Sequence, residues 1–230
     1  MSIAGRTIYK VNSWATPDFD IKDPSLVLYL PLWYPDSETT GSTIISKDIN
    51  RRSCSVTGAA LGSQGRYFDG DDYINISDAP SLNPIDAITI MEWINPTSFG
   101  TDYTCPLGKG ANEQWYFRLG TASQLISIQM NKESENIWRN VEHPTALVAG
   151  TWYHLVATYD GATMAIYLNT VKATNPHTGT IGVIANPLYI GNNATFWYFN
   201  GPIGEARIYN QALTAGEVMN DYLATKWRYQ

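Results

Sequence analysis

Residues 151–169 read TWYHLVATYDGATMAIYLN and form the most informative stretch of the chain. Two runs of alternating side chains, Thr151–Tyr159 and Met164–Asn169, stand on either side of Asp160-Gly161. Alternation with a period of two is typical of β-strands, and Asp-Gly is a favoured pair in the tight turns of hairpins. The stretch therefore predicts an antiparallel hairpin.

The chain continues this pattern from Ser25 onward, because short apolar and aromatic runs alternate with turns rich in Gly, Asp and Asn. The other predicted strands are Leu26–Trp33, Tyr67-Phe68, Tyr73–Ile76, Ile88–Ile94, Gln114–Leu119, Leu125–Met130, Leu188–Ile190 and Gly204–Tyr209. Many short strands of this kind predict an all-β, two-sheet antiparallel sandwich of jelly-roll type. A short C-terminal helix is also expected, since Thr214 and Glu217 have the spacing of a capping box.

The composition excludes several classes of protein. Charged residues make up 16% of the 230 residues and aromatic residues 13%, whereas globular proteins typically contain about 25% charged residues. So many aromatic residues argue against disorder, and the shortage of charged residues argues against a coiled coil. A net charge of −6 without a basic stripe excludes nucleic-acid binding. No apolar run approaches 18 residues, so membrane insertion is not expected.

The chain divides into an arm and a domain. Residues 1–24 show no sustained period and contain two prolines, so we predict an N-terminal arm or extension followed by one domain at 25–230. Met1–Lys10 lacks the basic-then-apolar pattern of a signal peptide. The location therefore stays open, with a virion surface or the extracellular space as the expectations. Cys54 and Cys105 allow one disulfide or two buried thiols.

Five segments, in order along the chain, resemble the motifs of the laminin-G-like group of concanavalin A-like lectin/glucanase jelly rolls. They are residues 67–74 (YFDGDDYI), 89–96 (TIMEWINP), 151–161 (TWYHLVATYDG), 164–169 (MAIYLN) and 199–213 (FNGPIGEARIYNQAL). The resemblance extends from about Leu26 to Tyr222. It implies two sheets of about six or seven strands each. It also implies that rim loops or the concave face bind sugars, proteins or a calcium ion.

The carboxylates do not have the spacing that glycoside cleavage needs. That reaction uses two carboxyl groups about 5–10 Å apart, which on a strand means acidic residues at i and i+2 or i+4. In the family that the chain resembles, glycanases carry a strand of the type ExDxxE, and the chain has no such pattern. His143, His154 and His177 show no metal-ligand or nucleophile spacing. We therefore expect that the protein is not an enzyme.

Glu92 lies on the aliphatic face of the predicted strand Ile88–Ile94. An unpaired carboxylate there is costly. Two interpretations stay open: a salt bridge to Arg118 or Arg207, or a polar anchor in a binding cleft.

The turn that contains Asp69, Asp71 and Asp72 is the candidate metal site. Ca²⁺ takes six to eight oxygen ligands, and this turn supplies three carboxylates in a short span. We expect a structural Ca²⁺ here, with a turn in which the Asp side chains accept backbone N–H groups as the alternative. Gly204 replaces an acidic residue that the resemblance implies, which removes one ligand.

Two clusters combine aromatic rings with polar side chains, as sites for sugars do. The candidate ligand-binding residues are Trp115, Tyr116, Trp138, Arg139, Asn192, Asn193, Trp197 and Tyr198. The alternative for the aromatic residues is burial in the core. However, the four consecutive aromatics at 196–199 cannot all face one side, so some are expected to be exposed.

These observations predict a non-catalytic, lectin-like binding module that recognises a glycan or a protein through rim loops. The alternative is a structural or assembly protein of a phage-like virion, such as a capsid decoration, tail or spike subunit. In that case the N-terminal arm would dock onto a partner, and a homo-oligomer or a larger particle is expected.

Overall fold

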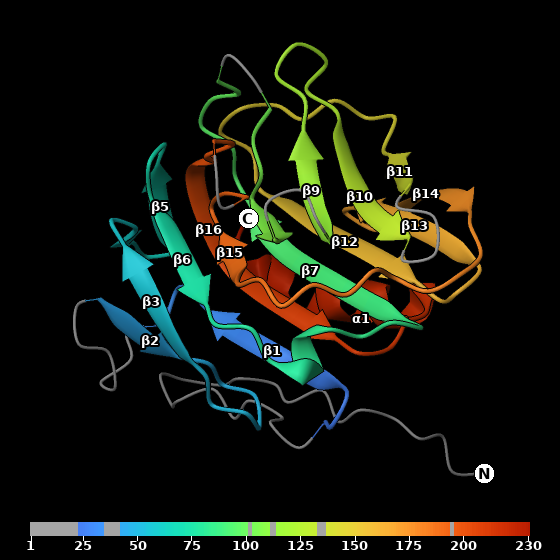
Figure 1. The fold of residues 1–230 in the computed structure, drawn as a ribbon. Helices are drawn as coiled ribbons and strands as arrows, with labels where there is room; N and C mark the ends of the chain where they lie inside the picture. Colours follow the sequence, from blue (N-terminus) through green and yellow to red (C-terminus); the bar gives the residue numbers. More distant parts are fainter. Residues whose placement is uncertain (1–22, 35–41, 101–102, 111–113, 133–136, 194–195) are drawn as a thin grey trace, which may run out of the picture.

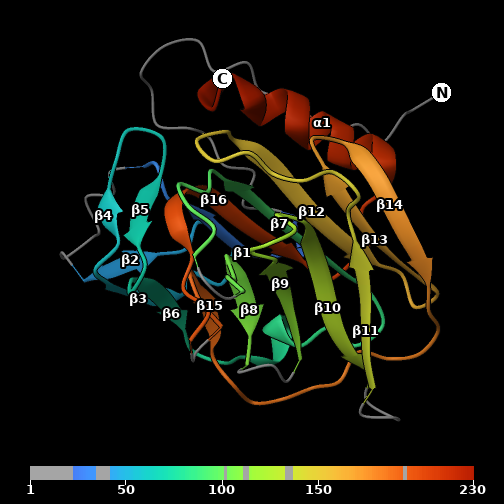
Figure 2. The same ribbon diagram turned by 90° about the horizontal axis from the view of Figure 1, so that it is seen from above.

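The computed structural model describes residues 23–34, 42–100, 103–110, 114–132, 137–193 and 196–230 (Figure 1). These residues form two antiparallel sheets of eight strands each, one α-helix and two short 3₁₀ turns. Two sheets stacked in layers, with a helix outside one of them, confirm the predicted sandwich (Figure 2). The sheets hold more strands than the six or seven that the resemblance implies.

Sheet A is the layer beside the helix. Its strands, in spatial order, are β14 (Val171–Pro176), β13 (Thr163–Leu168), β12 (Tyr153–Tyr159), β7 (Ile88–Ile94), β16 (Asn200–Tyr209), β5 (Arg66–Asp69) and β4 (Ala60–Leu61). The long strand β16 pairs with β7 along one edge. Its other edge pairs first with β5 and then with the eighth strand, β1 (Leu26–Pro31).

Sheet B is the opposite layer. Its strands, in spatial order, are β11 (Ile137–Glu142), β10 (Ile126–Lys132), β9 (Trp115–Leu119), β8 (Leu107–Lys109), β15 (Leu188–Ile190), β6 (Tyr73–Ile76), β3 (Ser53–Thr57) and β2 (Thr43–Ile45). A 3₁₀ turn, η1 (Pro80–Leu82), follows β6.

The hairpin at Asp160-Gly161 is confirmed. Strands β12 and β13 pair antiparallel, from Tyr159 opposite Met164 to Leu155 opposite Leu168. The Asp160 carboxylate accepts the N–H groups of Ala162 and Thr163 at 2.9 and 2.7 Å. Gly161 has a φ of +86°, a conformation in which a side chain would be strained.

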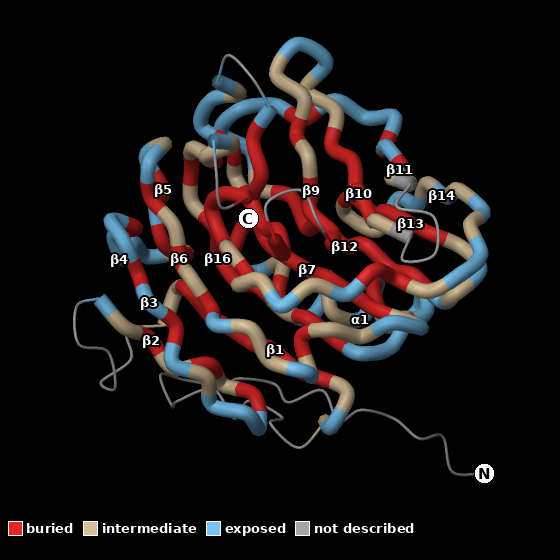
Figure 3. Tube along the Cα trace, viewed as in Figure 1, coloured by how far each residue is buried: buried red, intermediate tan, exposed pale blue. Residues whose placement is uncertain are grey.

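The core lies between the two sheets, and buried positions follow the strands of both layers (Figure 3). Each central strand contributes alternate residues to it, as Trp115, Phe117 and Leu119 do from β9. Strand β14 was not predicted because it is an edge strand with an exposed-to-intermediate pattern and no apolar face. Strand β11, at the edge of sheet B, also lacks a continuous apolar pattern.

The helix α1 (Ala215–Thr225) covers the outer face of sheet A (Figure 2). Its capping box is confirmed, since the Thr214 hydroxyl accepts the N–H of Glu217 and the Glu217 carboxylate accepts the N–H of Thr214. Val218 packs with Met91 and Val156 in a second apolar cluster. The 3₁₀ turn η2 (Lys226–Arg228) ends the helical segment.

The C-terminus adds an aromatic layer to this face. The Tyr229 ring stacks on Trp93 at 4.5 Å between ring centroids, and lies against Gly204. A Cβ atom at Gly204 would lie 2.2 Å from that ring, so glycine is required here. Packing of the C-terminus thus explains the residue at 204.

No helix in the described ranges has both the length and the apolar character to cross a membrane. In the same ranges no helix covers the outer face of sheet B.

Candidate functional site

Strand β9 divides its side chains between the core and the outer face of sheet B. Trp115 is fully buried in the core, while Tyr116 and Arg118 alternate to the outer face. The prediction that Trp115 lines a sugar platform is therefore wrong. The alternation of Trp115, Phe117 and Leu119 is the physical reason, because all three fill the space between the sheets.

Four rings from separate segments meet on this outer face and form what we call the aromatic surface: Tyr103, Tyr116, Trp138 and Trp197. Tyr116 is central, with its ring centroid 5.2 Å from that of Trp138 and 5.5 Å from that of Trp197. Tyr103 extends the series, 5.4 Å from Trp197. The two sequence clusters thus converge on one place, because β9 lies beside β10 and the segment after β15 folds back toward it.

The segment after β15 is held by backbone hydrogen bonds. Gly191 donates to the carbonyl of Pro106 at 2.7 Å, and the carbonyl of Trp197 accepts the N–H of Cys105 at 2.9 Å. The Asn193 side-chain oxygen accepts the N–H groups of Phe196 and Trp197, both at 3.3 Å. These contacts place the Trp197 ring beside Tyr116.

Asn192 and Asn193 are buried, with 2% and 0% exposure. The prediction that they contact a ligand is wrong, because no open surface reaches them. Asn193 instead bonds the backbone that carries Trp197. It acts as a positioning residue.

The run at 196–199 divides between surface and core, which confirms that some of its rings are exposed. Phe196 is 82% exposed and Phe199 is buried in the core. Trp197 and Tyr198 are partly exposed. Phe199 thus belongs to the core, while Trp197 is partly exposed as a member of the aromatic surface.

Arg139 does not lie on the same face of β11 as Trp138. Neighbouring residues on β11 face opposite sides, and Arg139 lines a separate shallow hollow with Tyr159, His177 and Thr180. The prediction that Arg139 and Trp138 form one site is therefore wrong.

Polar groups lie in register beside the aromatic surface. Tyr116 is opposite Gln129 on β10, which is opposite Asn140 on β11. The Gln129 amide donates to the Ser127 hydroxyl at 3.0 Å, while Asn140 is exposed. Burial raises the pKa of the Tyr116 phenol, so the group stays neutral and is able to donate a hydrogen bond.

Two residues of this region were not predicted. Tyr103 lies outside the strands and carries no periodic signal. Arg118 was considered only as a partner of Glu92, although its spacing of two from Tyr116 indicates the same outer face. Its guanidinium carbon lies 4.6 Å from the centroid of the Tyr103 ring.

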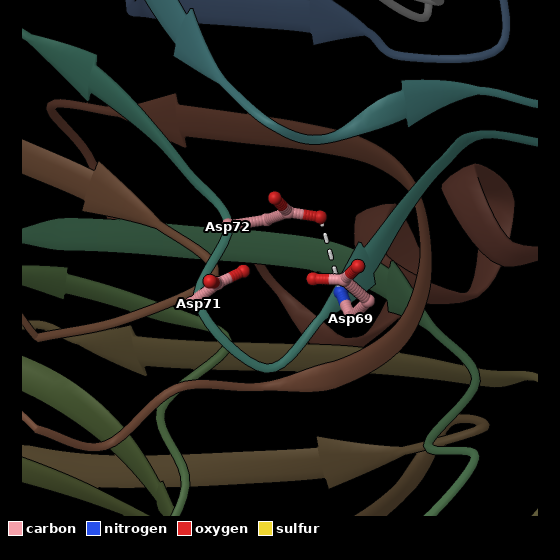
Figure 4. A group of neighbouring side chains, drawn as sticks. All are labelled: Asp69, Asp71 and Asp72. Carbon is pink, nitrogen blue, oxygen red and sulfur yellow. Dashed lines mark hydrogen bonds between the residues drawn. The ribbon is translucent and has the colours of Figure 1, made fainter.

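The three aspartates of the candidate metal site are brought together at the turn between β5 and β6 (Figure 4). One oxygen from each of Asp69, Asp71 and Asp72 lies within 4.8 Å of the others. Asp72 also accepts the N–H of Asp69 at 3.1 Å, as the turn alternative requires. Its carboxylate fits against Gly58, where a Cβ atom would overlap it.

The charges of this turn favour a cation. The hydrogen bond and negative charge of Asp69 raise the pKa of Asp71, and burial raises that of Asp72. Among the described residues no basic side chain forms an ion pair with the three carboxylates. An all-oxygen donor set fits Ca²⁺ and supplies three of its six to eight ligands. Calcium binding stays a prediction.

Glu92 fits neither open interpretation. Its side chain is fully buried on the face of β7 that points into the core, and both carboxylate oxygens lack a hydrogen-bond partner. Arg207 instead pairs with Glu205 at 2.7 Å, and Arg118 lies over Tyr103. The interpretation of Glu92 as the partner of Arg118 or Arg207 in a salt bridge is therefore wrong. A carboxyl group without exposed surface also cannot anchor a ligand in a cleft.

Cys54 and Cys105 are buried free thiols, which resolves the alternative between a disulfide and two thiols. Of the predicted arm, residues 1–22 lie outside the described residues. The arm's docking role, the assembly into a virion or homo-oligomer, and the location of the protein stay predictions.

Two of the solved structures that are similar to this chain are binding domains of toxins. The binding domain of Paraclostridial mosquitocidal protein 1 is 18% identical, with a TM-score of 0.67 over 88% of this chain and 52% of the other. The binding domain of botulinum neurotoxin DC, solved in complex with SialylT, is 13% identical, with a TM-score of 0.68 over 89% of this chain and 52% of the other. This chain therefore spans about half the length of these toxin domains.

Domain 4 of AbnA, an extracellular arabinanase from Geobacillus stearothermophilus, was solved in complex with arabinotriose. It is 18% identical, with a TM-score of 0.66 over 90% of this chain and 98% of the other. At these identities the likeness shows the fold. No curated protein matches the chain.

A family model described as the concanavalin A-like lectin/glucanases superfamily, of the third laminin-G type, matches residues 68–219. The match includes the whole of four of the five segments that carry the resemblance, and the segment 67–74 from Phe68 onward. The chain belongs to the concanavalin A-like lectin/glucanase superfamily.

Proposed function

We propose that this protein is a non-catalytic carbohydrate-binding module that holds a glycan on the aromatic surface of sheet B. The observation that carries the proposal is the convergence of Tyr103, Tyr116, Trp138 and Trp197 on a sheet face that no described helix covers.

The chemistry of the aromatic surface suits a sugar. A pyranose or furanose ring has an apolar face of C–H groups and a rim of hydroxyls. Partly exposed rings such as Trp138 and Trp197 offer flat apolar surface to the C–H face of the sugar. The exposed amide of Asn140 offers hydrogen bonds to the rim of hydroxyls. Tyr116 is 6% exposed and packs against the rings of Trp138 and Trp197. Aromatic residues with a few polar groups are typical of ligand sites.

A non-catalytic role is supported by the position of the carboxylates. On the outer face of sheet B, beside the aromatic surface, Glu142 is exposed on β11. Glu92 is sealed in the core, and the three aspartates lie in the turn between β5 and β6, where the Asp72 carboxylate accepts the N–H of Asp69. Glycoside cleavage needs two carboxyl groups around a bound sugar.

The structural neighbours support the same class of function. AbnA domain 4 was solved with arabinotriose and the neurotoxin DC binding domain with SialylT. Both were solved with a ligand bound, so a binding role is the proposal that agrees with the shared fold.

A glycan array, followed by calorimetry with the glycans that bind, tests the proposal. Trp197→Ala and Trp138→Ala each remove one ring of the aromatic surface. We expect each to lower the affinity by about tenfold or more, the effect of losing a central aromatic contact.

The matched control is Trp227→Ala. Trp227 is 60% exposed on the helical side of the molecule and makes no contact with the aromatic surface, so its variant should bind like the wild type. The proposal is wrong if no glycan binds, or if all three variants bind equally well. Turnover of a bound oligosaccharide would contradict the non-catalytic assignment.

A further inference from the structure

Arg118 lacks the ion pair that holds three other arginines of the described residues. Arg52, Arg207 and Arg228 each have a carboxylate within ion-pair distance, at 3.2, 2.7 and 3.3 Å respectively. Arg66 also has no carboxylate partner, but it is buried and its guanidinium donates to the Ala59 carbonyl at 2.7 Å. Arg118 is partly exposed, and no carboxylate of the described residues lies within that distance. In a chain of net charge −6, an unpaired guanidinium on the proposed glycan face stands out.

The guanidinium is held by an aromatic ring instead. The guanidinium carbon lies 4.6 Å from the centroid of the Tyr103 ring, and the Tyr103 ring in turn contacts the ring of Trp197. Stacking on a ring uses the face of the planar guanidinium and leaves its N–H edges available. Those edges match the two oxygens of a carboxylate in a bidentate pair.

The carboxylate of Glu142 lies on the same face but does not pair with Arg118. Arg118 is opposite Ser127, and Ser127 is opposite Glu142, so the two side chains stand two strands apart. No ion pair joins them in the part of the chain that the structure describes. The Ser127 hydroxyl donates to the backbone carbonyl of Arg118 and does not occupy the guanidinium.

We infer that the glycan bound on the aromatic surface carries a carboxylate, as uronic and sialic acids do, and that this carboxylate pairs with Arg118. The inference rests on the proposed function. The sugar ring lies against Tyr103 and Trp197, so that the acidic group reaches the guanidinium at the edge of the aromatic surface.

The test compares paired glycans that differ in charge alone. An array presents sialylated oligosaccharides beside their asialo forms, and oligogalacturonides beside their methyl esters. Sulfated forms of the same oligosaccharides separate a carboxylate from any other anion. The expected result is that the acid member of a pair binds at least tenfold more tightly, and that this advantage shrinks as salt is added.

Arg118→Gln then assigns the effect to the residue. The loss of a charge-assisted hydrogen bond pair is expected to weaken the acidic glycan roughly tenfold to a hundredfold, with the affinity for the neutral partner changed less than about twofold. Arg118→Lys keeps the charge without the planar fork and should give an intermediate loss. The control is Lys172→Gln, which removes a cation that also lies over a tyrosine, Tyr167, but in sheet A.

The outcomes separate the two proposals. If neutral and acidic members bind equally, or if Arg118→Gln lowers both to the same extent, the inference is wrong and the carbohydrate-binding module stands. A preference for the sulfated forms alone also overturns the carboxylate. If no glycan on the array binds, both proposals fail.

Discussion

Replacement of Glu92 by Gln is the perturbation whose result follows most directly from the structure. Glu92 lies at the middle of β7, opposite Leu155 on one neighbouring strand and Ala206 on the other. Its side chain is fully buried and both oxygens lack hydrogen-bond partners. Burial therefore raises the pKa of this carboxyl well above its ordinary value, and the folded protein holds it protonated.

The magnitude follows from proton linkage. The unfolded chain releases this proton above about pH 4.3, whereas the folded chain retains it until the pH reaches the raised pKa. Stabilisation by the protonated form is fully present below about pH 4.3 and is lost as the pH rises. The loss amounts to about 1.4 kcal/mol for each pH unit between the two pKa values.

His154 acts in the opposite direction. It is buried on the other face of sheet A beside Trp93 and Tyr222, and burial lowers its pKa to about 3. Its contribution is present above about pH 6.5 and is lost as the pH falls toward 3. Between about pH 4.3 and 6.5 the contributions of Glu92 and His154 therefore cancel. Above that range Glu92 alone lowers the stability.

Glutamine has the shape of the protonated acid and does not titrate. The free energy of unfolding of Glu92→Gln should equal that of the wild type near pH 4 and exceed it by about 1.4 kcal/mol more for each further pH unit, until the pH reaches the raised pKa of Glu92. For a chain of this size the melting temperatures should separate by roughly 3–6 °C per pH unit. Calorimetry from pH 4.5 to 8 measures this difference.

Glu142→Gln is the control, because Glu142 is an exposed carboxylate on β11. Its melting curve should follow that of the wild type at every pH. A constant offset between Glu92→Gln and the wild type across the whole range would refute the buried, protonated carboxyl.

Three further predictions concern the turn, the C-terminus and the arm. Addition of Ca²⁺ should raise the melting temperature of the wild type, and chelator should reverse this; Asp71→Asn should abolish the shift, and a wild type indifferent to Ca²⁺ argues against the metal site. Gly204→Ala should lower the free energy of unfolding by about 1–3 kcal/mol, because the new methyl group meets the Tyr229 ring. Its control, Gly216→Ala, has room for the methyl group in the helix and should be neutral or stabilising. Equal effects of the two variants would contradict the packing of Tyr229 on Gly204. The assembly hypothesis predicts oligomers by sedimentation of the full chain, and a monomer at every concentration would remove its support.

Local signals were sufficient for much of the fold. The Asp160-Gly161 turn and the Thr214–Glu217 capping box each act within a few residues, so their effects are visible in the sequence. The inward direction of Glu92 also followed from simple alternation along β7. What alternation did not show was the lack of a partner for Glu92, because a partner depends on strands distant in the sequence.

The candidate site depended on distant contacts to a greater extent. Tyr116, Trp138 and Trp197 meet because β9, β11 and the segment after β15 approach one another in sheet B. Sequence reasoning named these three rings but placed them in two clusters, and it grouped Trp115 with Tyr116 although adjacent residues on a strand face opposite sides. The order of strands in the sheet, which local patterns do not encode, decides which rings meet.

The NMR response of the eight tryptophan indole N–H groups to the glycan that binds most tightly on the array tests directly whether the glycan occupies the aromatic surface. We expect chemical-shift changes at Trp138 and Trp197, with Trp93 and Trp227 unchanged on the helical side of sheet A. Changes confined to the helical side, with Trp138 and Trp197 unaffected, would contradict this expectation.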